Sequence, residues 1–150
     1  MDELIDQLRE NGEQVWIAGP QPEQAIVSLE HALGVSLPPS YRQFLTKFGA
    51  FKLLNSSVAG IVGGNPLAKV AGSLYGDTQQ YRQDCGLPKH LLVIQPDEDA
   101  PYCLDTRKLG RDGEMPVVCY EPDSGYIDRM ASSFGEWFMD YLQLQVDEDA

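Results

Sequence analysis

Three cysteines and two histidines in this chain could supply a nucleophile, a base or zinc ligands. Cys85 and His90 invite comparison with a thiol–imidazole pair, but their spacing matches no nucleophile motif and no third group is evident to orient the histidine. His31 lies among polar neighbours on an expected helix and favours an exposed position. No pair has the C-x2-C or H-x3-H spacing of a zinc site. These residues therefore indicate neither a catalytic centre nor a metal centre.

Two further segments have only part of a ligand-binding motif. Asp97-Glu98-Asp99 lacks the alternate ligand spacing and the glycine of an EF-hand loop. Gly60–Gly64 is rich in glycine within an expected strand, but no Gly-Lys-Ser/Thr follows, so it fails as a phosphate-binding loop. Because no nucleophile, base and orienting group emerge together, we expect a non-catalytic protein with no cofactor.

Acidic residues are the strongest chemical signal in the chain. The sequence holds 23 Asp and Glu against 11 Lys and Arg, a net charge of −12. Acids are absent from residues 31–76, which carry Arg42, Lys47, Lys52 and Lys69. An acidic surface repels nucleic acid and attracts basic partners, although acidity also simply keeps proteins soluble. The four bases either form a separate face or pair with neighbouring acids, and the sequence leaves both arrangements open.

The acids that a basic partner could contact cluster in predicted turns and beside a predicted helix. One group lies in a hairpin turn, a second lies in the next turn along the chain, and a third flanks the middle helix. Aspartate also favours turns because of its local hydrogen bonds, so each acid could instead be a solvated turn residue. The predicted partner-binding set is Asp97, Glu98, Asp99, Glu121, Asp123, Asp77 and Asp84.

The segment from residue 25 to residue 50 predicts two helices joined by a fixed connection. Apolar residues recur at helical spacing up to Leu33, and Gly34 can take the left-handed conformation that ends a helix. Pro38-Pro39-Ser40 begins the second helix, because proline fits a first turn that needs no N–H donor. Gly49 stops it. The apolar stripe of the second helix places four residues in the core: Tyr41, Phe44, Leu45 and Phe48.

The remaining pattern alternates short strands with helices. Helices are predicted over residues 2–9 and 73–82, and a closing helix begins at Ser132 or Ser133, with Glu136 placed for a capping box if Ser133 is the cap. Strands are predicted over residues 58–62, 91–94, 102–104 and 117–120, and the continuous apolar run at 91–94 suggests a central position. Hairpin spacing favours an α+β fold: a mainly antiparallel sheet of short strands, with helices packed mostly on one side.

Length and composition indicate one domain. We divide it into an N-terminal helix and turn (1–21), a main domain (22–144) and an acidic, frayed tail (145–150). The acidic first ten residues have no apolar stretch typical of a signal peptide, and no apolar run approaches the roughly 20 residues that span a bilayer. Three cysteines are too few for a disulfide framework. We therefore expect a cytoplasmic protein that is not in a membrane.

The same helix pair carries a family resemblance. The chain resembles the SUKH superfamily of SMI/KNR type, whose pattern is an apolar residue and a Glu, then Leu-Gly, Leu-Pro, Tyr and Phe-Leu. The match continues in order over about residues 22–144, including Thr78 and Arg82 in the middle helix and a Ser-Phe-x-x-aromatic start to the closing helix. One departure is Phe48, where an Asn or Tyr is usual. The matching motif residues are Ile26, Glu30, Leu33-Gly34, Leu37-Pro38, Tyr41 and Phe44-Leu45.

The resemblance implies a binding protein without catalytic residues. Bacterial members are immunity proteins that bind and block a cognate toxin, often a nuclease, and fungal members regulate cell-wall synthesis. Our first hypothesis is therefore an immunity protein that neutralises a polymorphic toxin with a basic domain, without contacting nucleic acid directly. The second is a regulatory or scaffolding module that binds an endogenous partner. The resemblance transfers no contact residues, and the sequence leaves the oligomeric state undetermined.

Overall fold

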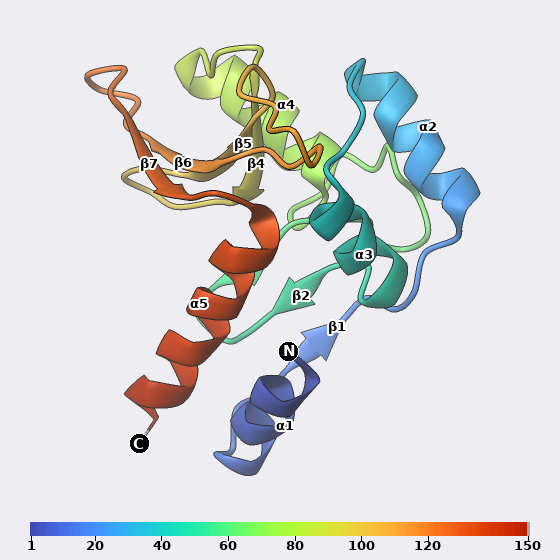
Figure 1. Cartoon of the computed structure of the whole chain (residues 1–150), viewed down its shortest axis with the longest axis vertical. Coiled ribbons are helices and arrows are strands. Elements are labelled where there is room, and N and C mark those ends of the chain that lie inside the picture. Colours follow the sequence, from blue (N-terminus) through green and yellow to red (C-terminus); the bar gives the residue numbers. More distant parts are fainter. Residues whose placement is uncertain (150) are drawn as a thin grey trace.

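The computed structural model describes residues 1–149, which form five helices and seven strands (Figure 1). The helices are α1 (Asp2–Glu10), α2 (Glu23–Leu33), α3 (Pro39–Lys47), α4 (Leu74–Cys85) and α5 (Phe134–Glu148). The strands are β1 (Trp16–Ile17), β2 (Phe51–Lys52), β3 (Ser57–Val58), β4 (Leu91–Gln95), β5 (Tyr102–Asp105), β6 (Val117–Tyr120) and β7 (Ile127–Ala131).

The strands form two antiparallel sheets, ordered β1-β2-β3 and β4-β5-β6-β7. The sheets meet where the Ala59 amide donates to the Ile94 carbonyl at 2.7 Å and the Gln95 amide side chain donates to the Ser57 carbonyl at 3.1 Å. These contacts place the end of β3 beside β4 without joining the two sheets into one. The expected α+β fold in a single domain is confirmed.

Helices cover both faces of the four-stranded sheet. On one face, Leu92 and Ile94 belong to the main core with residues of α1, α2, α3 and α5. On the other face, Leu91 and Val93 form a smaller cluster against which Tyr81 of α4 packs. All five helices therefore contribute to the main core, α4 only through Leu74 and Tyr75 at its start, and the rest of α4 covers the opposite face.

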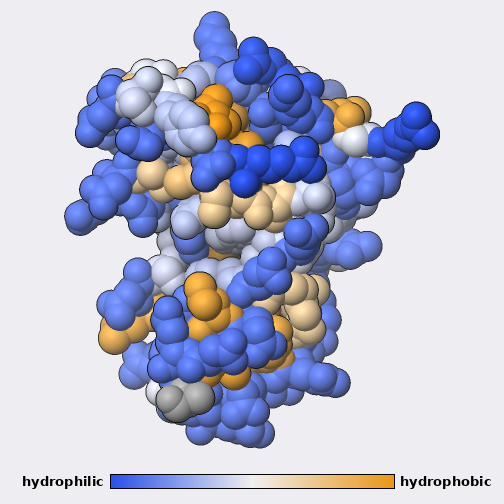
Figure 2. All heavy atoms as spheres, turned by 60° about the vertical axis from the view of Figure 1, so that its left-hand side comes forward, coloured by the Kyte–Doolittle hydropathy of each residue, from blue (hydrophilic) through white to orange (hydrophobic). Residues whose placement is uncertain are grey.

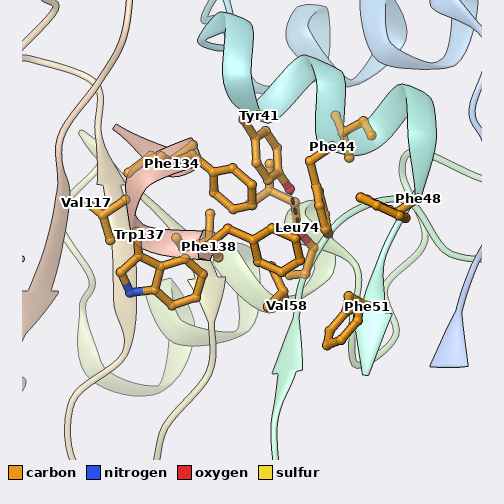
Figure 3. Packing of buried hydrophobic residues seen from close by; sticks show 14 of the residues in the cluster. Tyr41, Phe44, Phe48, Phe51, Val58, Leu74, Val117, Phe134, Trp137 and Phe138 are labelled. Carbon is orange, nitrogen blue, oxygen red and sulfur yellow. Dashed lines mark hydrogen bonds between the residues drawn. The ribbon is translucent and has the colours of Figure 1, made fainter. Parts of the chain in front are cut away.

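Aromatic rings from α3 and α5 form the centre of the main core (Figure 3). Phe44 of α3 contacts Phe134 and Phe138 of α5, with ring centroids 5.0 and 5.2 Å apart. Tyr41 packs edge-on against Phe134 and donates its buried hydroxyl to the Ala59 carbonyl at 2.6 Å. That hydrogen bond removes the cost of burying the hydroxyl and ties α3 to the chain between the two sheets.

The predicted helix pair forms as expected, and Glu30 fixes its connection. Gly34 has φ +70° and ends α2, and Pro39 begins α3. The Glu30 carboxylate accepts from the Leu37 amide at 2.7 Å and pairs with Arg42 at 3.2 Å. One carboxylate on α2 therefore holds both the chain that leads into α3 and a side chain of α3 itself.

Several elements differ from the sequence-based expectation. β4 is not central, because it pairs only with β5 along one edge; its other edge is covered, since Val93 donates its amide to the Thr78 hydroxyl of α4. The strand expected over 58–62 is regular only at β3, and Gly60 and Val62 form isolated bridges beyond it. The segment assigned to a frayed tail is helical through Glu148.

Candidate functional site

The two acidic turns predicted from sequence lie at the same end of the four-stranded sheet. Strands β4 to β7 form an antiparallel meander, so the β4–β5 and β6–β7 turns must emerge at one end and the β5–β6 loop at the other. The Tyr120 amide donates to the Pro101 carbonyl at 3.0 Å, which joins the bases of the two turns. This acidic end lies at the left of Figure 1. Figure 2 brings that side forward, and hydrophilic residues cover most of the face.

Within the first turn, Asp97 has a structural role while its neighbours face solvent. The Asp97 carboxylate accepts from the Asp99 and Ala100 amides at 2.9 and 3.1 Å. The Tyr81 hydroxyl of α4 both donates to the Asp97 carbonyl and accepts from its amide. These bonds fix the turn. The exposed carboxylates of Glu98 and Asp99 have no hydrogen-bond or ion-pair partner among residues 1–149.

The second turn is closed by its own backbone. The Gly125 amide donates to the Glu121 carbonyl at 2.7 Å, and the Glu121 amide donates to the Tyr126 carbonyl at 2.9 Å. Glu121 and Asp123 are exposed, and their carboxylates also lack a partner within the described part of the chain. Tyr126, 61% exposed, is a large amphipathic side chain on the same turn. Tyrosines in such positions are frequent anchors at protein interfaces.

Asp128 on β7 extends the acidic end and was missed by sequence reasoning. It is exposed and lies opposite Cys119 in the strand register. The pKa of the Cys119 thiol is raised, first by burial and then by the charges of Asp97, Asp128 and Glu121. The charges of acids in both turns and on β7 therefore act on the same Cys119 thiol. Neither apolar alternation nor a strong β-former run marks residues 127–131, so only the strand pairing places Asp128 in this group.

Asp84 and Asp77, the two predicted acids of the middle helix, do not belong to this acidic group. Asp84 is exposed on α4 and accepts from the Gln80 side chain at 2.9 Å, and among residues 1–149 no hydrogen bond joins its side chain to either turn. Asp77 is only 8% exposed, and its carboxylate accepts from the Gly72 amide at 3.2 Å. We therefore exclude Asp77 from the candidate surface. The candidate site consists of Glu98, Asp99, Glu121, Asp123 and Asp128, with Asp97 shaping the first turn.

The buried Asp77 carboxyl group is instead expected to make the stability of the folded protein depend on pH. Burial raises its pKa to about 6 from the usual 3.8, while the Gly72 amide opposes the shift. The folded state therefore binds this proton more tightly than the unfolded state does, so the stabilisation is complete below about pH 3.8 and is lost as pH rises through about 6. We expect Asp77→Asn, which can still accept from Gly72, to raise the free energy of unfolding at pH 7.5 by about 1 kcal/mol.

Urea unfolding of wild type and Asp77→Asn from pH 4 to pH 8 measures this difference. The gain in the variant should grow as pH rises toward about 6 and level off above it. A stability difference that stays constant over that range would show that the carboxyl group does not titrate as inferred. Asp84→Asn, at an exposed position on the same helix, is the matched control and should follow the wild-type profile.

The groups considered for nucleophilic or metal chemistry are not assembled. The Cys85 thiol donates to the Tyr81 carbonyl at 3.2 Å, and no hydrogen bond joins it to His90 within residues 1–149. Burial and the Arg107 charge lower the pKa of His90. Over the same residues, no three His, Cys, Asp or Glu side chains are placed to hold a metal ion. No helix in this described range is long and apolar enough to cross a membrane.

Comparison with known proteins defines the class to which this fold belongs. The family model described as SUKH_5, SMI1-KNR4 cell-wall, matches residues 1–143, so the chain belongs to this SUKH family. A crystal structure of a protein from Pseudomonas syringae pv. tomato has a similar fold, with a TM-score of 0.62. Its sequence is 23% identical, and the match covers 95% of this chain and 99% of the other. The structural likeness thus extends over nearly the whole length of both chains.

Proposed function

We propose that this chain is a non-catalytic immunity protein that acts in the cytoplasm by binding and neutralising a cognate polymorphic toxin. The observation that carries the proposal is the acidic end of the four-stranded sheet. Two turns and the edge strand β7 present carboxylates there that have no partner among residues 1–149, around the exposed Tyr126. Unpaired carboxylates beside a tyrosine match the composition expected of a surface that binds a basic protein.

A nuclease toxin is the best-matched partner on electrostatic grounds. An enzyme that cleaves nucleic acid needs a positive surface to hold phosphate groups, and an acidic protein can occupy that surface and exclude the substrate. Opposite charges also raise the association rate, which at low salt can reach about 10⁸–10⁹ M⁻¹s⁻¹. Rapid capture suits an inhibitor that must act before a small dose of toxin cleaves its target.

A regulatory or scaffolding module is the second candidate, and the description of the matching family favours it by naming the cell wall. Such a module would bind an endogenous protein, and the same acidic end could serve that contact. The two candidates differ in what binding achieves: an immunity protein abolishes the activity of its partner, whereas a module leaves that activity in place or directs it.

Co-expression tests the proposal. The immunity role requires a neighbouring gene that encodes a toxin domain. That domain should kill cells when expressed alone, and this chain should restore growth and co-purify with it in equal amounts. An unrelated nuclease toxin, expressed at the same level, should still kill. Continued killing by the neighbouring domain, with both proteins folded and abundant, would contradict the immunity role.

A further inference from the structure

The outer face of the three-stranded sheet carries a second, independent feature. The strand register aligns Trp16, Lys52 and Ser57 on one face of this sheet. The opposite face carries Phe51, which packs against Phe138 and Tyr141 of α5. The main core therefore covers only the face of this sheet that carries Phe51, and the outer face, which carries Trp16, lies outside it.

A groove of about 490 Å³ lies against this outer face. One wall comes from β1, β2, β3 and the turn after β2, and the other comes from the loop that leads into α4. Most of its surface is apolar, and two large side chains that line it remain exposed, Trp16 at 46% and Leu54 at 76%. Pockets that bind small organic molecules have volumes of about 300–1,000 Å³ and mostly apolar walls.

The loop wall is fixed by hydrogen bonds. Gly72, which lines the groove, donates its amide to the Asp77 carboxylate and accepts at its carbonyl from the Gly60 amide at 2.9 Å. The Leu74 amide donates to the Gly60 carbonyl at 2.8 Å and continues the same connection into α4. Hydrogen bonds to Asp77 and Gly60 therefore fix the loop wall of the groove relative to the rest of the protein.

The charge of the groove opposes the charge of the whole molecule. Lys52 is the only charged residue among those that line it, and Lys69 belongs to the loop that forms the far wall. Arg42 and Lys47, the other bases of the acid-free segment, pair with Glu23, Glu30 and Asp2. Among residues 1–149, Lys52 and Lys69 form no ion pair. The chain has a net charge of −12, yet the residues that line this apolar groove include a lysine and no acid.

We propose that this groove binds a small organic anion, with a flat apolar body against Trp16 and Leu54 and one negative group beside Lys52. The apolar walls supply the contact area, and the ammonium group selects for a negative charge. The acidic end of the four-stranded sheet could not hold such a ligand, because its carboxylates would repel it. The inference does not depend on the identity of the toxin or on the immunity role.

Titration with 1-anilinonaphthalene-8-sulfonate, an aromatic anion, tests the proposal on the whole chain. Folded wild type should bind it saturably, one molecule per chain by calorimetry. Lys52→Gln, which changes an exposed side chain, should weaken binding about threefold to tenfold through loss of the charge pair. Trp16→Ala should weaken it by a similar factor through loss of the aromatic contact.

Two controls separate this site from general dye binding. Lys89→Gln removes an exposed lysine from the loop after α4, outside the groove, and should bind like wild type. The uncharged probe N-phenyl-1-naphthylamine should bind Lys52→Gln and wild type equally. The proposal fails if folded wild type shows no saturable binding of the anion, or if Lys52→Gln binds the anion with wild-type affinity. Far-UV circular dichroism of each variant establishes that it is folded.

Discussion

Gly60→Ala is expected to lower the free energy of unfolding by about 3 kcal/mol or more, or to prevent folding altogether. A β-carbon at position 60 would lie 1.7 Å from the Gly49 carbonyl oxygen and 3.1 Å from a methyl group of Leu45. The nearest obstacle is backbone, which cannot rotate aside as a side chain can. The substitution must therefore push apart the end of α3 and the chain between the two sheets.

The backbone around Gly60 has little freedom to move. The Ile61 amide donates to the Gly49 carbonyl at 2.9 Å, so the colliding oxygen is itself held in a hydrogen bond. Gly49 is confined in turn, because a β-carbon there would lie 2.3 Å from the Gly19 carbonyl oxygen. Gly19, Gly49 and Gly60 thus lie where three chain segments cross with their backbones in direct contact. Natural domains have only about 5–15 kcal/mol of stability, so the loss is a large share of it.

Urea unfolding followed by tryptophan fluorescence measures the effect, since Trp137 is buried in the main core. Gly34→Ala is the matched control: Gly34 has φ +70° but open space around its β-carbon position, so only backbone strain of about 1–2 kcal/mol applies. A Gly60→Ala protein as stable as Gly34→Ala would show that the segments separate without cost, contrary to the crossing inferred here.

Charge reversal at the acidic end is expected to have the largest effect on function. We expect the combined replacement of Glu98, Asp99, Glu121 and Asp123 by lysine to slow association with the cognate toxin domain about tenfold to a hundredfold at low salt. The physical reason is that steering of a basic partner requires the field of these unpaired carboxylates. Asp97 is kept, because its side chain holds the turn through the Asp99 and Ala100 amides.

The control places the same charge change elsewhere. Glu3, Glu10, Asp147 and Glu148 are exposed on α1 and α5, which extend to the bottom of Figure 1, away from the acidic end at the upper left. Their replacement by lysine changes the net charge equally and should slow association much less. Stopped-flow rates over a range of salt concentrations make the comparison, and the salt dependence should be weaker in the acidic-end variant. Equal rates for the two variants would remove the acidic end from the interface.

Local signals accounted for much of the fold. Gly34, Pro39 and Ser133 stand at helix ends as predicted, and the Ser133 hydroxyl accepts from the Glu136 amide at 3.1 Å. These features depend on residues within one helical turn, so the order of residues along the chain is enough to predict them. The aromatic stripes of α3 and α5 were likewise predictable, because helical periodicity alone puts their rings on one face.

Features set by distant segments were not predictable in this way. The strand at 91–94 was expected to be central because it is wholly apolar, yet it is an edge strand of its sheet. Its outer edge is covered by Thr78 of α4 and by Ala59, which follows β3. β7 escaped detection because residues 127–131 do not alternate and owe their strand conformation to pairing with β6. Hydropathy reports how buried a segment is, without reporting which element buries it.

The candidate site likewise has features that the sequence predicts and features that depend on the fold. The sequence by itself determined that acids are concentrated in two turns and absent from residues 31–76, since charge and turn chemistry belong to individual residues. Only the tertiary structure decided which acids face solvent together. The sheet topology brings Glu98 and Asp123 to one end and adds Asp128, while the loop before α4 buries Asp77. Burial and proximity arise from contacts between segments far apart in the chain, and no local pattern records them.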